Sequence, residues 1–288
     1  MNTPVDYLLI GHVAHDRTPD GPQLGGTVAY SARVAQAFGL TVGILTSAHP
    51  DDPVLPALEG LAVHLIPAAS STIFVNRYTP TGREQVVEGY ASPLRFADIP
   101  EAWRRAPIVH LGPITPALDE SLTPAAFPDA LVGITPQGYM RTWGADGRVI
   151  PVPWRQAPEM LPHAITVLSD EDLGFDSARE AEYAAQARAL VVTRNDRGAT
   201  LYRNGKRHDY PAPAIEQLIH PTGAGDVFAA ALFCTLFRHP EDWDRAMRVA
   251  INVASTFVEQ CPDPGAPSAA SMRAVLAAPR VQAVLGRG

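Results

Sequence analysis

The feature that most limits how this chain can fold is a series of short apolar runs that do not strictly alternate with polar residues. Each run is four or five residues long and consists mainly of Val, Ile and Leu. This pattern is typical of parallel strands that are buried on both faces, whereas strands with one solvated face alternate between apolar and polar residues. The six runs are Tyr7–Ile10, Val42–Thr46, Ile108–Leu111, Leu131–Ile134, Ile165–Leu168 and Leu190–Thr193.

Stretches with helical character lie between and after these runs. They are Val28–Phe38, Pro100–Arg105, Ser177–Ala187, Asp226–Arg238, Asp242–Gln260 and a final helix near Ser268–Leu285. Strands that alternate with helices predict an α/β fold with a doubly wound, mostly parallel sheet and helices on both faces. We expect residues 1–288 to form one such domain.

Two segments, roughly 13–24 and 72–92, break the alternation because they mix polar and apolar residues. The second contains Thr72–Tyr78, the turn Pro80-Thr81-Gly82 and then Glu84–Tyr90. A turn of this kind between two strand-like runs predicts a β-hairpin. The two segments together predict a small sheet that acts as a lid over a site, although an ordinary edge hairpin fits the pattern equally well.

Charge and cysteine content exclude several classes of protein. The formal net charge is -7, and the basic residues are scattered rather than gathered on one face, which argues against a nucleic-acid partner. The two cysteines, Cys234 and Cys261, do not make a disulfide framework, and a reducing cytosol suits them. Neither a signal peptide nor an apolar run long enough to span a membrane is expected.

The strongest motif is the stretch from Thr222 to Phe228, which reads Thr-Gly-Ala-Gly-Asp-Val-Phe and precedes an apolar helix. Its small residues allow the backbone to approach a ligand closely. The first amides of the helix would form an anion hole. Asp226 at the mouth of this hole is suited to take a proton from an attacking hydroxyl. The alternative is a plain glycine turn in which Asp226 caps the helix.

This stretch resembles the C-terminal signature of the PfkB, or ribokinase-like, carbohydrate kinases. The resemblance covers essentially the whole chain and is best in the second half. It implies an α/β body with a β lid and transfer of a phosphoryl group from ATP, with Mg²⁺, to a hydroxyl group. Asp226 would then be the catalytic base, and Gly223, Ala224 and Gly225 would form the anion hole.

The resemblance also extends to the N-terminal third of the chain. Asp16 follows the first strand, where the family has an aspartate that binds sugar hydroxyls. Gly25-Gly26 resembles the glycine pair that lets the substrate approach the backbone. The family usually has Asn a few residues further on, but here Tyr30 takes that place, so ordinary ribose or fructose recognition is in doubt.

The stretch from Thr193 to Gly198 resembles the Thr-x-Gly-x-x-Gly nucleotide loop of the family. Asn195 replaces the first glycine, and Asn tolerates left-handed backbone better than most residues. The resemblance implies that Thr193 contacts phosphate, that Asn252 packs on adenine, and that Asn195, Gly198 and Thr222 complete the nucleotide site. As an alternative, the segment is a hairpin turn leading to Thr200–Tyr202.

Two further departures from the family pattern concern the phosphate and metal sites. His220 stands where the signature usually begins with Asp. Ser169-Asp170-Glu171-Asp172 takes the place of an Asn-x-x-Glu motif that is tied to the metal and its waters. Asp172 is the residue in this segment that could hold metal-bound water.

Several local features are similar to the inositol kinase branch of the family. They are Gly11-His12-Val13, Gly25-Gly26, Asn76-Arg77-Tyr78 and Gln137-Gly138-Tyr139. A cyclitol is a ring of hydroxyls without an anion, and Asp16, Asn76, Arg77 and Gln137 could provide its hydrogen bonds.

We therefore expect an ATP-dependent kinase for a small polyol, with a cyclitol such as myo-inositol as the first expectation. Furanose sugars or nucleosides, of the ribose, fructose or adenosine type, are the alternative. Because of the departures from the motifs, a non-catalytic regulator that binds a nucleotide or sugar also stays open. A dinucleotide-dependent oxidoreductase is discounted, because no GxGxxG follows the first strand. The expected partner is the small-molecule substrate alone, without nucleic acid or membrane, and the chain is expected to be a monomer or a homodimer.

Overall fold

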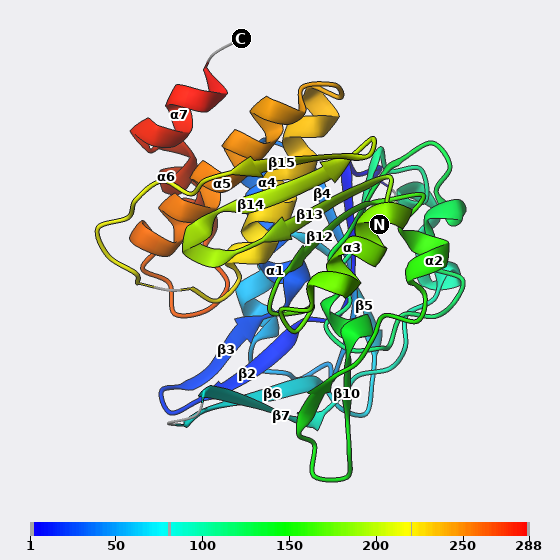
Figure 1. Cartoon of the computed structure of the whole chain (residues 1–288). Coiled ribbons are helices and arrows are strands. Elements are labelled where there is room, and N and C mark those ends of the chain that lie inside the picture. The colour runs from blue at the N-terminus through cyan, green and yellow to red at the C-terminus, as the bar shows by residue number, and fades with distance from the viewer. Residues whose placement is uncertain (1–2, 80–81, 220, 287–288) are drawn as a thin grey trace.

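The computed structural model describes residues 3–79, 82–219 and 221–286. Its centre is a nine-stranded sheet in the order β15-β14-β13-β12-β9-β8-β1-β4-β5, which runs across the molecule in Figure 1. All neighbours from β5 to β13 pair in parallel, and β14 and β15 are antiparallel additions. The strands are β1 (Tyr7–Ile10), β4 (Val42–Ala48), β5 (Ala62–Pro67), β8 (Ile108–Leu111), β9 (Leu131–Ile134), β12 (Ile165–Ser169), β13 (Ala189–Thr193), β14 (Ala199–Arg203) and β15 (Lys206–Tyr210).

The central strands of the sheet are buried on both faces, as their apolar runs predict. In β1, Tyr7 and Leu9 belong to one hydrophobic cluster, and Leu8 and Ile10 belong to the other. Successive side chains of a strand point to opposite faces, so a strand between two cores must be apolar throughout. The six predicted strands and the doubly wound α/β fold are thus confirmed.

Helices cover both faces of the sheet. On one face α1 (Thr27–Ala37), α4 (Ala224–Arg238) and α5 (Trp243–Gln260) pack together, while α2 (Ala157–Met160) and α3 (Ser177–Gln186) lie on the other (Figure 1). No helix in the described part of the chain is long and apolar enough to cross a membrane.

Two helix predictions are wrong in detail. Pro100–Arg105 forms only the short 3-10 helix η3 (Glu101–Trp103). The final helix is two helices, α6 (Ala269–Ala277) and α7 (Pro279–Leu285), because Ala278 is extended with ψ 141. A proline disfavours helical backbone in the residue before it and suits the first position of a new helix.

A second sheet lies at the carboxyl edge of the first. It contains β2 (Ala14–Thr18), β3 (Gly21–Gly25), β6 (Thr72–Thr79) and β7 (Gly82–Gly89) in the order β3-β2-β6-β7. The predicted hairpin is confirmed as β6 and β7, and its turn residues 80–81 lie outside the described residues. The hairpin of β10 (Arg141–Trp143) and β11 (Val149–Pro151) continues this sheet through a bridge between Val86 and Arg148. The action of this second sheet as a lid over the site stays a prediction.

Candidate active site

A cleft lies between the carboxyl ends of the parallel strands, the first turns of α1 and α4, and the second sheet. Open α/β sheets bind ligands at this edge. The cleft brings together residues that are far apart in the sequence. Of the predicted site residues, those that line it are Asp16, Gly26, Gln137, Asp172, Thr193, Asn195, Thr222, Gly223, Ala224, Gly225 and Asp226.

The signature motif forms a left-handed turn that opens α4. Gly223 is the N-cap with φ 80, a conformation in which a side chain is strained. A Cβ at Gly225 would meet no atom within 4 Å, so this part of the turn faces open space. The first amides of a helix mostly lack a carbonyl one turn earlier to bind, although the amide of Ala224 donates to the Pro221 carbonyl oxygen at 3.3 Å. The turn therefore presents the beginning of α4 to the cleft, as an anion hole requires. His220, the departure before the motif, lies outside the described residues.

Asp226 is half-buried in the cleft and does not cap the helix. It is the third residue of α4, and the N-cap has no side-chain hydrogen bond, so the capping alternative is wrong. The pKa of Asp226 is raised to about 6, mainly by burial and also by the nearby Asp172 carboxylate, against the lowering effects of a hydrogen bond from Thr27 and the charge of Arg141. At pH 7 this carboxyl group is largely ionised and has a pKa suited to accepting a proton.

Asp16 lines the cleft from β2, on the side formed by the second sheet. The Oδ2 atom of Asp16 would lie 2.2 Å from a Cβ at Gly25. Gly26 has φ 90, and its Cβ would lie 2.7 Å from the backbone oxygen of His12. The glycine pair therefore makes room within the protein itself, for the Asp16 carboxylate and for the chain entering β2. Gly26 lines the cleft as well, whereas Gly25 does not.

The predicted polar groups of the second sheet are arranged differently from the expectation. Asn76 does not line the cleft. Its Oδ1 accepts a hydrogen bond from Gln85 Nε2 at 3.0 Å, and Gln85 is the residue of that pair that lines the cleft. The side chain of Arg77 lies outside the described residues.

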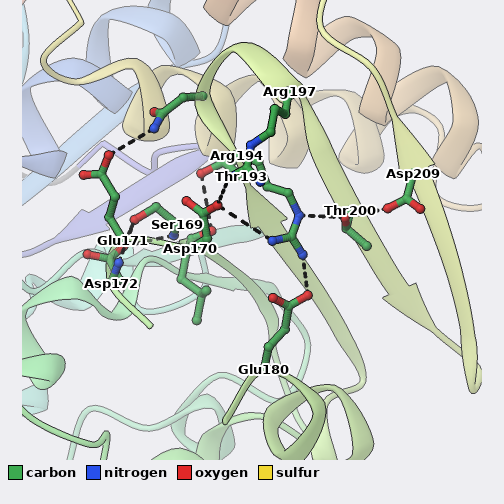
Figure 2. A network of polar contacts seen from close by, with 12 residues as sticks. Ser169, Asp170, Glu171, Asp172, Glu180, Thr193, Arg194, Arg197, Thr200 and Asp209 are labelled. Carbon is green, nitrogen blue, oxygen red and sulfur yellow. Dashed lines mark hydrogen bonds and ion pairs between the residues drawn. The ribbon is translucent and has the colours of Figure 1, made fainter. Parts of the chain in front are cut away.

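The segment 169–172 directs its two aspartates in opposite directions (Figure 2). Asp172 lines the cleft, where its Oδ2 accepts hydrogen bonds from the Ser169 hydroxyl at 2.7 Å and the Ser169 amide at 3.0 Å. Gln137 donates to its Oδ1 at 3.3 Å. Asp170 is buried and forms ion pairs with Arg194 and Arg197, so its charge is used within the protein.

The predicted nucleotide loop is a hairpin turn that joins two antiparallel strands, β13 and β14, and its binding of a nucleotide stays a prediction. Asn195 has φ 52, which confirms that it adopts left-handed backbone. Its side chain donates to Glu171 at 3.0 Å. Gly198 has φ 93 and packs against Tyr210, where a Cβ would lie 2.0 Å from the carbonyl oxygen.

Asn252 does not line the main cleft. It lines a second hollow together with Tyr210, Pro211 and Ala212, and its Nδ2 donates to the Arg248 carbonyl oxygen at 2.8 Å. The chain at Tyr210 also contacts Gly198, so the loop between Thr193 and Gly198 lies between the cleft and this hollow.

Four polar residues that sequence reasoning missed also line the cleft: Thr27, Gln85, Thr135 and Arg141. Thr27 is the first residue of α1 and hydrogen-bonds Asp226. Arg141 brings a positive charge to Asp226 from β10. One of these residues could have been predicted from the sequence. Gln85 pairs with Asn76 in the register of the predicted hairpin, so the choice of Asn76 also indicated Gln85.

The cleft suits a magnesium ion that arrives with a phosphate chain. Among the described residues, no group of three or more His, Cys, Asp or Glu side chains could hold a metal. Mg²⁺ in kinases is usually bound by one or two carboxylates, waters and substrate phosphates. Asp172 and Glu171 line the cleft and offer carboxylate oxygens for such a shared site.

Comparisons with known proteins agree with this geometry. Residues 164–264 match the pfkB family carbohydrate kinases. The chain is 28% identical over 246 residues to a cytidine kinase of Thermococcus kodakarensis, which covers 78% of this chain and 86% of that protein.

Solved structures show the same fold. A pyrophosphate-dependent kinase of the ribokinase family, complexed with a pyrophosphate analog and myo-inositol, superposes with a TM-score of 0.77 at 19% identity, covering 93% of this chain and 99% of that one. The Arabidopsis thaliana ribokinase complexed with ribose and ATP gives a TM-score of 0.67 at 17% identity, covering 96% and 100%.

The fold is therefore that of the ribokinases. Together with the match of residues 164–264, which contain the signature turn, this fold makes the chain similar to the PfkB carbohydrate kinases.

Proposed function

We propose that this protein transfers the terminal phosphoryl group of ATP to a hydroxyl group of a small, neutral polyol. The observation that carries the proposal is the position of Asp226, directly after the open turn Gly223–Gly225 and in one cleft with Asp16. Backbone amides at a helix start stabilise a phosphoryl group, and an adjacent carboxylate with a pKa near neutrality accepts a proton.

In the proposed reaction the oxygen of the substrate hydroxyl attacks the terminal phosphorus of ATP and its proton passes to Asp226. The bond between this phosphorus and the oxygen that bridges it to the next phosphate breaks, and ADP leaves with that oxygen. The amides of the signature turn and the guanidinium of Arg141 bind the oxygens of the phosphoryl group. Asp16 accepts hydrogen bonds from other hydroxyls of the polyol and orients it. Magnesium, held through Asp172 and Glu171, would neutralise charge on the donor phosphates when bound.

The donor is proposed to be ATP, placed along the loop from Thr193 to Gly198 and toward the hollow at Asn252. That arrangement suits an elongated nucleotide, since the loop lies between the two cavities. Pyrophosphate is a second candidate, favoured by the resemblance to a pyrophosphate-dependent kinase and by the separation of Asn252 from the main cleft.

The acceptor is proposed to be a cyclitol such as myo-inositol. Asp16, Gln85, Gln137 and Thr135 place polar groups on several sides of the cleft, which suits a ring with hydroxyls all around it. A nucleoside is the second candidate, because a cytidine kinase is the relative with 28% identity.

A matrix of donors and acceptors tests the proposal. ATP and pyrophosphate, each with Mg²⁺, would be incubated with myo-inositol, ribose, fructose, cytidine and adenosine, and phosphorylated product would be measured directly. We expect product with ATP and myo-inositol. Product only with cytidine would favour the nucleoside candidate. If no pair gives product, calorimetric titration with the same donors and acceptors would follow, and binding there would favour a non-catalytic regulator.

A further inference from the structure

A chain of three polar side chains runs from the core of the protein to the cleft. The Tyr7 hydroxyl lies 3.2 Å from His110 Nδ1, and His110 Nε2 lies 3.0 Å from the Thr135 hydroxyl oxygen. Tyr7 and His110 are completely buried, and Thr135, which lines the cleft, is 7% exposed. The three residues lie on or directly after the neighbouring strands β1, β8 and β9.

The ring of His110 is neutral and held in place. Burial lowers its pKa to about 3, so one ring nitrogen carries a proton and the other is an acceptor. Phe233 packs edge-on against the ring with centroids 5.0 Å apart, and Tyr7 does so from another direction at 6.2 Å.

The direction of these hydrogen bonds follows from the buried Tyr7 hydroxyl at the inner end of the three-residue chain. Within the described residues, His110 is the hydrogen-bond partner of the Tyr7 hydroxyl. If Nδ1 carried the proton, the Tyr7 O–H would be a buried donor without an acceptor, which is costly. Tyr7 therefore donates to Nδ1, the proton of His110 is on Nε2, and Nε2–H donates to the Thr135 oxygen.

The Thr135 O–H is left to donate into the cleft. His110 is its hydrogen-bond partner within the described residues, and its oxygen already accepts from that side. Thr135 also lies beside Thr27, since both are within 3.5 Å of a Cβ built at Gly112. Thr27 in turn binds Asp226, so the Thr135 hydroxyl is close to the proposed site of phosphoryl transfer.

We propose that Thr135 is a specificity-determining residue that donates a hydrogen bond to an oxygen atom of the polyol substrate, and that the buried pair Tyr7–His110 fixes it as a donor. This inference rests on the proposed function, because it concerns the acceptor side of that site. It predicts that the cleft requires an acceptor oxygen at one position of the substrate and tolerates the loss of that oxygen's own proton.

The tautomer can be measured without substrate or activity. Long-range ¹H–¹⁵N NMR of the intact protein should show His110 with a protonated Nε2 and a bare Nδ1 between pH 6 and 8. The Tyr7→Phe variant removes the donor to Nδ1 and should increase the Nδ1–H tautomer. A wild-type spectrum with Nδ1–H would overturn the proposed relay.

Substrate recognition is tested with monodeoxy and monoketo analogues of whichever polyol the wild type phosphorylates. One deoxy analogue should raise KM about tenfold, the effect of one lost hydrogen bond, and the ketone at the same carbon should not. For Thr135→Val, the KM of the parent polyol should rise by about the same factor, and the KM of the deoxy analogue should not rise further. Thr135→Ser, which keeps the hydroxyl, should restore discrimination.

The outcomes separate the two proposals. If wild-type protein phosphorylates no polyol, the proposed function fails, and the recognition role of Thr135 fails with it. If a polyol is phosphorylated but Thr135→Val and wild type respond alike to every analogue, while melting temperatures show both folded, only the role of Thr135 is overturned.

Discussion

Gly223 lies directly against the ring of Tyr30: a Cβ at Gly223 would come within 2.3 Å of two ring carbons. Tyr30 is buried and also meets Phe257 edge-on, with ring centroids 6.2 Å apart. Tyr30, which stands where the family usually has Asn, therefore packs directly beneath the signature turn. Both the positive φ of Gly223 and this ring exclude a side chain there.

Gly223→Ala should accordingly damage the anion hole. The turn must shift to relieve both the backbone strain and the clash with Tyr30, which moves the amides away from the phosphoryl group. We expect kcat to fall by about 10²-fold, as for loss of an oxyanion-hole donor. Gly225→Ala is the matched control, because a Cβ there meets nothing within 4 Å, and its stability should stay near wild type. Equal kcat in Gly223→Ala and wild type would contradict this account.

The rate should rise with pH through the pKa of Asp226. A base works only when ionised, so kcat/KM should increase as pH passes about 6 and level off above it. Arg141 lowers that pKa, so Arg141→Met should move the midpoint to higher pH, and Arg141→Lys should keep it closer to wild type. Steady-state rates from pH 5 to 9 measure both midpoints, and a midpoint unchanged in Arg141→Met would oppose the proposed contact.

Asp172→Asn should move the same midpoint in the other direction. The Asp172 carboxylate raises the pKa of Asp226, and an amide removes that charge while still accepting hydrogen bonds from Ser169. The midpoint should shift to lower pH, and the magnesium concentration needed for half-maximal rate should increase, because a carboxylate is lost from the phosphate site. An unchanged magnesium requirement would remove Asp172 from the metal site.

Asp226 should also cost the folded protein stability at neutral pH. Its folded pKa of about 6 lies above the ordinary 3.8, so its favourable contribution is complete below pH 4 and is lost as pH rises through 6. Asp226→Asn should thus be more stable than wild type at pH 8 by about 1–3 kcal/mol, toward the lower value because the group is partly exposed. Denaturant unfolding of both proteins at pH 4 and pH 8 measures this difference in the free energy of unfolding. If the difference between Asp226→Asn and wild type is no larger at pH 8 than at pH 4, the Asp226 carboxylate is not buried as a charge.

The strands that the sequence predicts are those that lie inside the sheet. Short, mostly apolar runs mark β1, β4, β8, β9, β12 and β13 because both faces of each strand are covered. The edge strand β15 reads Lys-Arg-His-Asp-Tyr and is exposed, so it carries no apolar signal. The other edge strand, β5, is only half-buried and was not predicted, although its sequence Ala-Val-His-Leu-Ile-Pro is mostly apolar.

The candidate site was predictable where its residues form a local motif. The turn Gly223–Gly225 and Asp226 are adjacent in the sequence, and their spacing carries the chemistry. Arg141 and Thr135 reach the cleft as single residues that belong to no motif, although Thr135 directly follows a predicted strand. Asn252 was placed by resemblance alone, and in the structure it lines a different hollow.

The most direct test of the central claim compares Asp226→Asn with Asp16→Asn in the phosphorylation of the preferred polyol. If Asp226 is the base, Asp226→Asn should lower kcat by about 10²–10⁴-fold with KM nearly unchanged, whereas Asp16→Asn should mainly raise KM. An Asp226→Asn enzyme that keeps a near-wild-type kcat would contradict the account.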